Sequence, residues 1–213
     1  EVGVPLKEIK SLLKGKTPGR IVPLLKEKSA EIEEKIKKLM HLQKIIQTKV
    51  ALTEQALETD FSSVSFQYLN EETFMISRNT LHLPERKYIA AISELIHDVE
   101  SHGLDEGYPV GGIFAREQIL TKDFYNYTHF YIKVKEGIDN INVHVRPKGL
   151  YAVGYQKGEE VEEAYSRMIQ FIEKNGMQVG EYAYEEFMLD EVMVDGFENQ
   201  ITKILIQVKE LLM

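Results

Sequence analysis

Residues 182–187 combine a central carboxylate with aromatic side chains at the spacing of a β-strand. The segment is Tyr-Ala-Tyr-Glu-Glu-Phe. Because alternate side chains of a strand share a face, Glu185 and Phe187 are expected on the same side of it. A carboxylate beside rings attracts a lipophilic cation, since low dielectric strengthens the Coulomb attraction and the rings add stacking and cation–π contacts. The segment therefore predicts a cation-binding site; the alternative is an exposed Glu185 beside an ordinary aromatic core.

The other candidate ligand-binding residues are aromatic or apolar and come from other predicted strands. They are Phe114, Tyr131, Tyr151, Tyr155 and Leu205. We expect these residues to form the walls of a pocket in which Glu185 supplies the negative charge.

Other residue patterns that could do chemistry are weak. The six histidines show no metal-ligand spacing, and Ser62, Ser63 and Ser65 lack the context of a nucleophile elbow. The sequence has no glycine-rich phosphate loop. Gly111 and Gly112 lie inside a predicted strand, where glycines indicate a close approach to the backbone. We therefore expect no catalytic residue, no metal site and no cofactor.

The elements that must position these residues form an internal repeat. Residues 91–103 match residues 164–176 at an offset of 73 (164 − 91), with identical Ala, Ser, Ile, Glu and Gly. A later strand matches at an offset of 74 (205 − 131). Agreement in the same order over several elements indicates a duplication. The repeat partner of Glu185 is Gly112, so a carboxylate in one half stands where the other half has no side chain.

Each half is predicted to be a ββαββ unit. A hairpin opens it, a helix ending at Gly103 or Gly176 follows, and two strands close it. The predicted hairpins pair 64–69 with 73–80 and 141–146 with 150–155, and the closing strands are 108–116, 128–135, 181–190 and 202–209. Side by side, the halves give an α+β fold with one sheet backed by helices. The groove along the pseudo-two-fold axis is the expected ligand site.

Alternation within residues 130–134 assigns side chains to the two faces of this sheet. Phe130, Ile132 and Val134 should face the helices, whereas Tyr131 should point the other way. By the repeat, Leu205 is expected on the same face as Tyr131.

Residues 21–57 are predicted to form one long helix. The stretch has no Gly, and its only Pro, Pro23, lies in the first turn. Apolar residues recur every seven positions in two series offset by four, which is typical of a coiled-coil seam. The first series is Leu25, Ile32, Leu39, Ile46 and Thr53, and the second includes Ile36, Val50 and Leu57. The seam predicts self-association; the alternative is that the helix packs along its own downstream domain.

Composition limits the class of protein. The 213 residues are 43% hydrophobic and 28% charged, as in an ordinary globular protein. No apolar run approaches the ~20 residues that cross a bilayer. The chain has no cysteine, which excludes disulfides and fits a reducing cytosol, and its net charge of −8 makes it a poor nucleic-acid binder by itself. We therefore expect a cytoplasmic protein without a membrane partner.

Two parts of the chain resemble a known family of regulators. Residues 1–13, Glu-Val-Gly-Val-Pro-Leu-Lys-Glu-Ile-Lys-Ser-Leu-Leu, look like the end of a MerR-type winged-helix DNA-binding domain. Residues 184–190, Tyr-Glu-Glu-Phe-Met-Leu-Asp, and 202–208, Thr-Lys-Ile-Leu-Ile-Gln-Val, resemble the closing strands of the GyrI-like effector-binding domain. Joined by a long helix, they resemble the BmrR-type multidrug-sensing regulators over essentially the whole chain.

The resemblance implies a ligand-responsive DNA-binding transcriptional activator rather than an enzyme. It implies a remnant of the winged helix-turn-helix domain in 1–16, a dimerisation helix in 17–60 and a GyrI-like effector-binding domain in 61–213. In that family, two copies pair through an antiparallel coiled coil. Effector binding reshapes the DNA-bound dimer so that RNA polymerase can start. DNA contact is expected through the helix-turn-helix domain, most of which this sequence lacks.

The resemblance also assigns site residues and leaves one enzymatic alternative. The family binds aromatic cationic effectors beside a buried Glu, which matches Glu185. Its pocket Tyr on the last strand falls on Leu205, where the ring is missing, and Tyr131 occupies the equivalent place in the first half. Some stand-alone GyrI-like proteins imply the alternative of a small-molecule hydrolase with Glu185 as general base. A protein-interaction module without a ligand-sized pocket is a third hypothesis.

Overall fold

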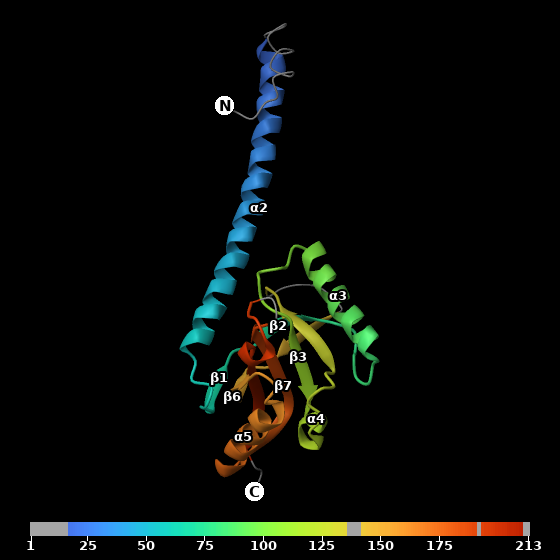
Figure 1. The fold of residues 1–213 in the computed structure, drawn as a ribbon. Coiled ribbons are helices and arrows are strands. Elements are labelled where there is room, and N and C mark those ends of the chain that lie inside the picture. Colours follow the sequence, from blue (N-terminus) through green and yellow to red (C-terminus); the bar gives the residue numbers. More distant parts are fainter. Residues whose placement is uncertain (1–16, 136–141, 191–192, 211–213) are drawn as a thin grey trace. The chain divides into compact units, whose positions relative to one another are not determined.

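The computed structural model describes residues 17–135, 142–190 and 193–210 (Figure 1). It contains two compact units, residues 1–46 and residues 47–213. The short helix predicted within 1–16 lies outside the described residues. In the described part of the chain, no helix is both long and apolar enough to span a membrane.

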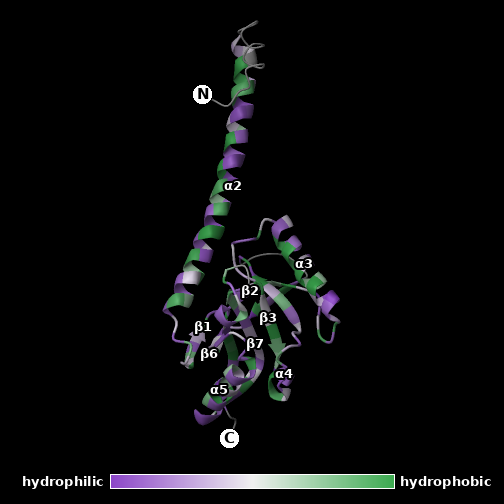
Figure 2. Cartoon of the chain, in the orientation of Figure 1, coloured by the Kyte–Doolittle hydropathy of each residue, from purple (hydrophilic) through white to green (hydrophobic). Residues whose placement is uncertain are grey.

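Helix α2 runs over Pro18–Glu58, which confirms the long helix predicted from the sequence. Its seam is open to solvent in the single chain: Ile36 is 50% exposed and Leu39 is 65% exposed. Figure 2 shows hydrophobic and hydrophilic residues interleaved along the whole helix. An exposed apolar seam of this kind is the surface that a coiled-coil partner buries.

The second unit confirms the predicted α+β fold with one sheet. In the described residues, eight strands follow the order β1-β6-β8-β7-β3-β4-β2-β5, and all neighbouring pairs are antiparallel. The strands are β1 (Ser65–Leu69), β2 (Glu72–Ile76), β3 (Gly111–Ala115), β4 (His129–Lys133), β5 (Val143–Arg146), β6 (Gly149–Lys157), β7 (Met177–Leu189) and β8 (Ile201–Glu210). The remaining elements are α3 (Glu85–Ser101), α4 (Arg116–Thr121), α5 (Val161–Lys174) and the 3-10 helix η1 (Phe197–Asn199).

The two longer helices of this unit end where the sequence predicts. Gly103 and Gly176 follow α3 and α5 with φ of 65° and 70°, a left-handed conformation that glycine adopts without a steric penalty. Helix α3 packs on β2 and β4, and helix α5 packs on β6 and β7. Their buried residues recur every three or four positions, so each helix turns one apolar face to the sheet.

The predicted pairing of the hairpins is wrong. Strand β1 pairs with β6 rather than with β2, and β5 pairs with β2 rather than with β6. The pseudo-two-fold axis therefore lies between β7 and β3, and each half of the sheet contains an edge strand that the sequence pattern assigned to the other half. Duplicated strands present similar edges, so local alternation cannot decide which copy is the partner.

The two faces of the sheet are built as the alternation predicts. Phe130 and Ile132 pack with Leu95 and Val99 of α3, whereas Tyr131 and Leu205 lie in an aromatic cluster on the opposite face. This opposite face is concave. His144 Nε2 on β5 lies 2.9 Å from the Tyr184 hydroxyl on β7, although β5 and β7 are four strands apart in the sheet. Flat strands at that separation would be about 19 Å apart, so the sheet curls strongly.

The last turns of α2, from Gln47 onward, belong to the same unit as the sheet. Ala56 is fully buried and packs with Met188, Leu189 and Ile201, at the ends of β7 and β8 that face this helix. The C-terminal part of α2 is therefore anchored to the sheet unit by apolar contacts.

Candidate functional site

Glu185 lies in the middle of β7 on the face covered by α3 and α5. It is 2% exposed. The Tyr127 hydroxyl donates a hydrogen bond to Oε2 at 2.5 Å, and the Tyr165 hydroxyl donates one to Oε1 at 2.8 Å. Both carboxylate oxygens are thus satisfied by neutral donors, so the carboxylate is hydrogen-bonded but not charge-paired by these two groups.

The surroundings of this carboxyl group change its acidity. Burial raises the pKa of Glu185 to about 7, because removal from water disfavours the charged form, and the hydrogen bonds from Tyr127 and Tyr165 only partly oppose this. Burial and the nearby carboxylate also raise the pKa of both tyrosine hydroxyls well above the ordinary value. Near neutral pH, Glu185 therefore exchanges its proton while the tyrosines remain neutral donors.

A glycine in the neighbouring strand makes room for the first of these tyrosines. Gly112 pairs directly with Glu185 across β3 and β7. A Cβ atom at Gly112 would overlap with the ring of Tyr127, so the ring lies flat against the strand only because no side chain is there. The Tyr127 ring also stacks on Phe114, with centroids 4.5 Å apart. Gly112 thus positions the hydroxyl that reaches Glu185.

The second tyrosine is held by α5. Tyr165 is fully buried on the helix face that carries Ala164, Met168 and Ile172 toward the sheet. Its ring stacks on Phe124, with centroids 4.2 Å apart and an angle of 12° between the rings. A ring held by stacking and burial keeps its hydroxyl aimed at Glu185 at little further entropic cost.

A cavity of about 380 Å³ opens beside Glu185 on the helix-covered face. Its walls come from both helices and from the central strands, and several of the lining side chains are aromatic. The aromatic residues are Phe124, Tyr125, Tyr127, Phe187 and Phe197. Aliphatic and polar residues complete the wall, among them Ile92 of α3, Val161 of α5, and Gln156 and Gln200. A concave, largely apolar cavity with one buried carboxylate has the composition of a small-molecule site.

The chain that forms this cavity is similar to known proteins. The family model of the GyrI-like small molecule binding domain matches residues 62–209. The chain belongs to this family. The Multidrug-efflux transporter 2 regulator of Bacillus subtilis (strain 168) is 73% identical over 210 residues, which are 99% of this chain and 77% of that relative. The GyrI-like domain and this regulator confirm the predicted class, a ligand-responsive transcriptional regulator.

Solved structures share the fold at low sequence identity. A cryo-EM structure of an EcmrR–DNA complex has a TM-score of 0.55 at 17% identity and covers 99% of this chain and 79% of that chain. A crystal structure of a hydrolase from Listeria innocua has a TM-score of 0.52 at 13% identity and covers 74% of this chain and 97% of that chain. The same fold thus occurs in a complex with DNA and in a protein named as a hydrolase, whereas the relative of 73% identity is named as a regulator.

Only part of the predicted site comes together in the GyrI-like domain. Phe187 lines the cavity beside Glu185, and Phe114 lies on the same sheet face under Tyr127. The prediction that Tyr131, Tyr151 and Leu205 surround Glu185 is wrong, because these residues belong to the cluster on the concave face. There Tyr131 stacks on Phe74 at 4.2 Å.

Tyr155 also lies away from the carboxylate. Its ring packs against Phe61, with centroids 6.1 Å apart, and it borders the apolar clusters of the concave face and of the α2 end. These residues were misplaced because successive side chains of a strand point to opposite faces of the sheet. Glu185 of β7 points to one face, whereas its neighbours Tyr184 and Glu186 point to the other. The rings of the concave face therefore pack around Tyr184 rather than around Glu185, and Tyr184 is fully buried among them.

Sequence reasoning missed the two residues that hold the carboxylate. Tyr165 could have been found, because the buried stripe of its helix includes its position. Tyr127 lies in the turn before β4, where no periodicity fixes the direction of a side chain. The ring of Phe197 was missed for the same reason, since it begins a short 3-10 helix between β7 and β8.

A separate charged cluster occupies the concave face. Glu186 is 7% exposed, and its Oε1 lies 2.6 Å from Lys133 Nζ, while Lys203 reaches Oε2 at 3.6 Å. Burial alone would raise the pKa of Glu186, but Lys133 and Lys203 outweigh burial and hold it below its ordinary value. Within the described residues, no group of three or more His, Asp or Glu side chains could hold a metal ion.

Proposed function

We propose that this GyrI-like regulator binds lipophilic cations in the cavity beside Glu185 and changes transcription in response. The observation that carries the proposal is the buried carboxylate held by two neutral hydroxyls at the wall of an aromatic cavity. A cation that enters supplies the missing positive charge in a place where water screens little. The name of the Bacillus relative, a regulator of a multidrug-efflux transporter, supports the same ligand class.

The cavity suits a small organic molecule in size and chemistry. Its volume of about 380 Å³ lies within the usual range for ligand pockets, roughly 300–1,000 Å³. Four of its aromatic residues, Phe124, Tyr127, Phe187 and Phe197, can contact an apolar or delocalised cation through ring faces or edges. Binding energy would then come from apolar burial, with orientation and charge selectivity from Glu185.

Titration of a cationic dye tests the proposal. Rhodamine 6G fluorescence polarisation is measured with the unaltered chain, with Glu185→Gln and with Glu181→Gln, a control at an exposed carboxylate of the same strand. We expect Glu185→Gln to weaken binding at least tenfold at pH 8, in line with the roughly 2–5 kcal/mol lost when a buried charge loses its partner. The control should bind within twofold. Equal affinity of all three removes the electrostatic role, and no affinity for any lipophilic cation removes the ligand class.

The regulatory output is proposed to run through a dimer on DNA. The exposed seam of α2 supports pairing of two copies as an antiparallel coiled coil, and the structure of the EcmrR–DNA complex has the same fold. We propose that the dimer contacts DNA through a helix-turn-helix domain, as the family resemblance implies, and affects RNA polymerase indirectly. Ile36→Glu in the seam should convert the dimer to a monomer in sedimentation equilibrium, whereas His41→Glu on the other side of the helix should not. A dimer in both variants would reject the seam as the interface.

A second candidate function is hydrolysis with Glu185 as general base. A pKa of about 7 favours it, because a base works best when its pKa is near the working pH. In this case an electrophilic ester would be converted by the unaltered chain and not by Glu185→Gln. Tight binding of rhodamine 6G without turnover of any ester would favour the sensor over the enzyme.

A further inference from the structure

The turn before the last strand of each half contains the same short motif. Phe124-Tyr125-Asn126 precedes β4, and Phe197-Glu198-Asn199 precedes β8, at the repeat offset of 73 (197 − 124). Both phenylalanines line the cavity beside Glu185. The two residues are thus equivalent in the duplicated fold and meet at the same space.

The first copy of this phenylalanine, Phe124, is buried against another ring of the folded protein. Phe124 is 2% exposed and stacks on Tyr165 with ring centroids 4.2 Å apart. The position of Tyr165 in the repeat corresponds to Ile92 on α3 (165 − 73). The ring that Phe124 stacks on therefore has no counterpart in the other half, where an aliphatic side chain replaces it.

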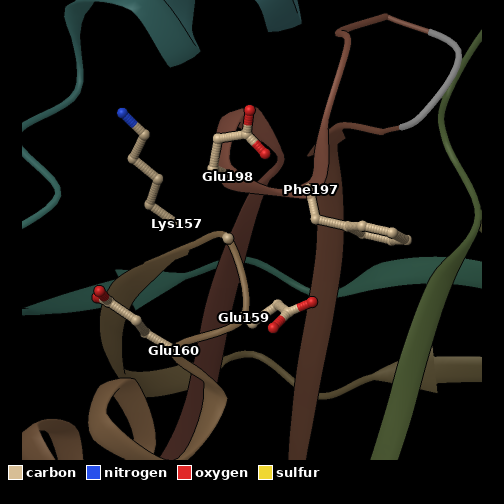
Figure 3. A pocket seen from close by; sticks show the side chains of 6 residues that line it. Lys157, Glu159, Glu160, Phe197 and Glu198 are labelled. Carbon is tan, nitrogen blue, oxygen red and sulfur yellow. The ribbon is translucent and has the colours of Figure 1, made fainter.

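The second copy, Phe197, is exposed to solvent. Phe197 is 62% exposed although it lines the cavity, and Ile92 lines the same cavity from α3. Figure 3 shows the ring of Phe197 pointing away from Lys157 and Glu198, its neighbours in the adjoining acidic hollow. An exposed phenylalanine beside an apolar cavity gains stability when a flat apolar group covers its face.

We infer that a planar aromatic effector binds with its ring between Phe197 and Ile92, at the place equivalent to that of the Tyr165 ring beside Phe124. Its positive charge then faces Glu185. This inference rests on the proposed function and adds a shape requirement to it: the effector is a flat, delocalised cation rather than a round aliphatic one. It also makes Phe197 a residue that determines ligand specificity.

Two ligands and a small set of variants test the shape requirement. Rhodamine 6G is the planar aromatic cation, and tetrabutylammonium is the aliphatic cation of the same charge, measured by competition or calorimetry. Phe197→Ala should weaken rhodamine 6G about tenfold, as expected for loss of one ring face, and should change tetrabutylammonium less than twofold. Phe197→Leu, which keeps apolar bulk without a ring, should resemble Phe197→Ala. Tyr68→Ala, at a ring 69% exposed on β1, should change neither affinity.

A reverse substitution supplies the missing ring from the protein. Ile92→Tyr gives α3 of the first half the side chain that α5 of the second half has at Tyr165. The new ring should stack on Phe197, fill the space of the effector and weaken rhodamine 6G at least tenfold, while thermal unfolding stays cooperative. Binding as tight as in the unaltered chain would show that the ring of the effector lies elsewhere.

The results of these experiments distinguish a failure of this inference from a failure of the proposed function. If the unaltered chain binds neither cation, the proposed function fails. If Glu185→Gln weakens binding while Phe197→Ala and Ile92→Tyr do not, the cation site stands and the place assigned to the ring is overturned. Equal weakening of both cations by Phe197→Ala would overturn the selectivity for flat ligands.

Discussion

Gly112 and Glu185 are cross-strand partners and also equivalent positions of the two halves. In a sheet with a two-fold axis between antiparallel strands, a residue faces its own repeat copy only where the axis passes. The axis therefore runs through this pair. One copy is a carboxylate and the other has no side chain, so the two halves of the GyrI-like domain differ at the axis itself, and Glu185 lines the cavity beside it.

Substitution of the smaller partner should disturb the larger one. Gly112→Ala places a methyl group where the Tyr127 ring lies, which should cost about 1–3 kcal/mol of unfolding free energy and break the bond to Glu185. Urea denaturation measures the loss. Gly149→Ala is the control, because its new Cβ would meet nothing within 4 Å. In a Tyr127→Ala background the cost of Gly112→Ala should nearly vanish; a cost that persists would mean that the strand itself, not the ring, rejects the side chain.

The raised pKa of Glu185 predicts a pH-dependent stability. The folded protein holds the proton of Glu185 up to about pH 7, whereas an ordinary carboxyl loses it near 4.5. Because the folded state binds the proton more tightly, stability from this group is present below about pH 4.5 and is lost as pH rises to about 7. The loss amounts to about 3 kcal/mol at most. Glu185→Gln should therefore unfold at a higher urea concentration than the unaltered chain at pH 8 and show no such gain at pH 5.

Equal differences between the two proteins at both pH values would contradict the raised pKa. The comparison is internal, because other titrating groups such as Glu186 are shared by both chains.

The same proton should couple to effector binding. A permanent cation favours the ionised carboxylate, so binding at pH 6 should release a proton from Glu185, whereas binding at pH 8 should not. Rhodamine 6G affinity should then fall roughly tenfold from pH 8 to pH 6. Calorimetry in buffers of different ionisation enthalpy reads the proton directly. A flat affinity profile in the unaltered chain would place the cation away from this carboxylate.

The charged cluster of the concave face should stabilise the folded protein because its charges are buried, and not because of its number of ion pairs. Lys133→Ala leaves the buried Glu186 with a weaker partner and should cost about 3 kcal/mol, as breaking a buried pair does. Lys135→Ala removes a lysine that is 77% exposed and pairs with Glu106, and should cost less than about 1 kcal/mol. Similar urea midpoints for the two variants would show that Glu186 is already neutralised by other groups.

The parts of the fold that were predicted from the sequence are those set by local periodicity. The coiled-coil seam predicted α2 because apolar residues recur every seven positions in a long run without glycine. Gly103 and Gly176 predicted the ends of α3 and α5. Alternation also placed Tyr131 on the face away from the helices. Each of these features depends only on neighbours in the chain.

Strand partners and the full cavity could not be predicted in this way. Duplication makes β1 and β5 similar in pattern, so either could pair with β2 or with β6, and only packing of the whole sheet decides between them. For the site, alternation predicted that Glu185 and Phe187 share one face of their strand. It could not predict whether Tyr151, which comes from another strand, lies on the same face of the sheet. Tyr127 comes from a turn whose side-chain direction follows from the space over Gly112, a contact that the sequence does not display.

The exchange of edge strands makes the second half of the sheet depend on the start of the domain. The segment 72–146 lacks β1 but needs no strand from elsewhere, whereas the half built on β6, β7 and β8 takes its edge from the start of the domain. A fragment beginning after β1 would leave β6 with an unpaired edge prone to aggregation. The duplicated domain should therefore melt in a single transition, because the half built on β6, β7 and β8 is completed by a strand that precedes the other half in the chain.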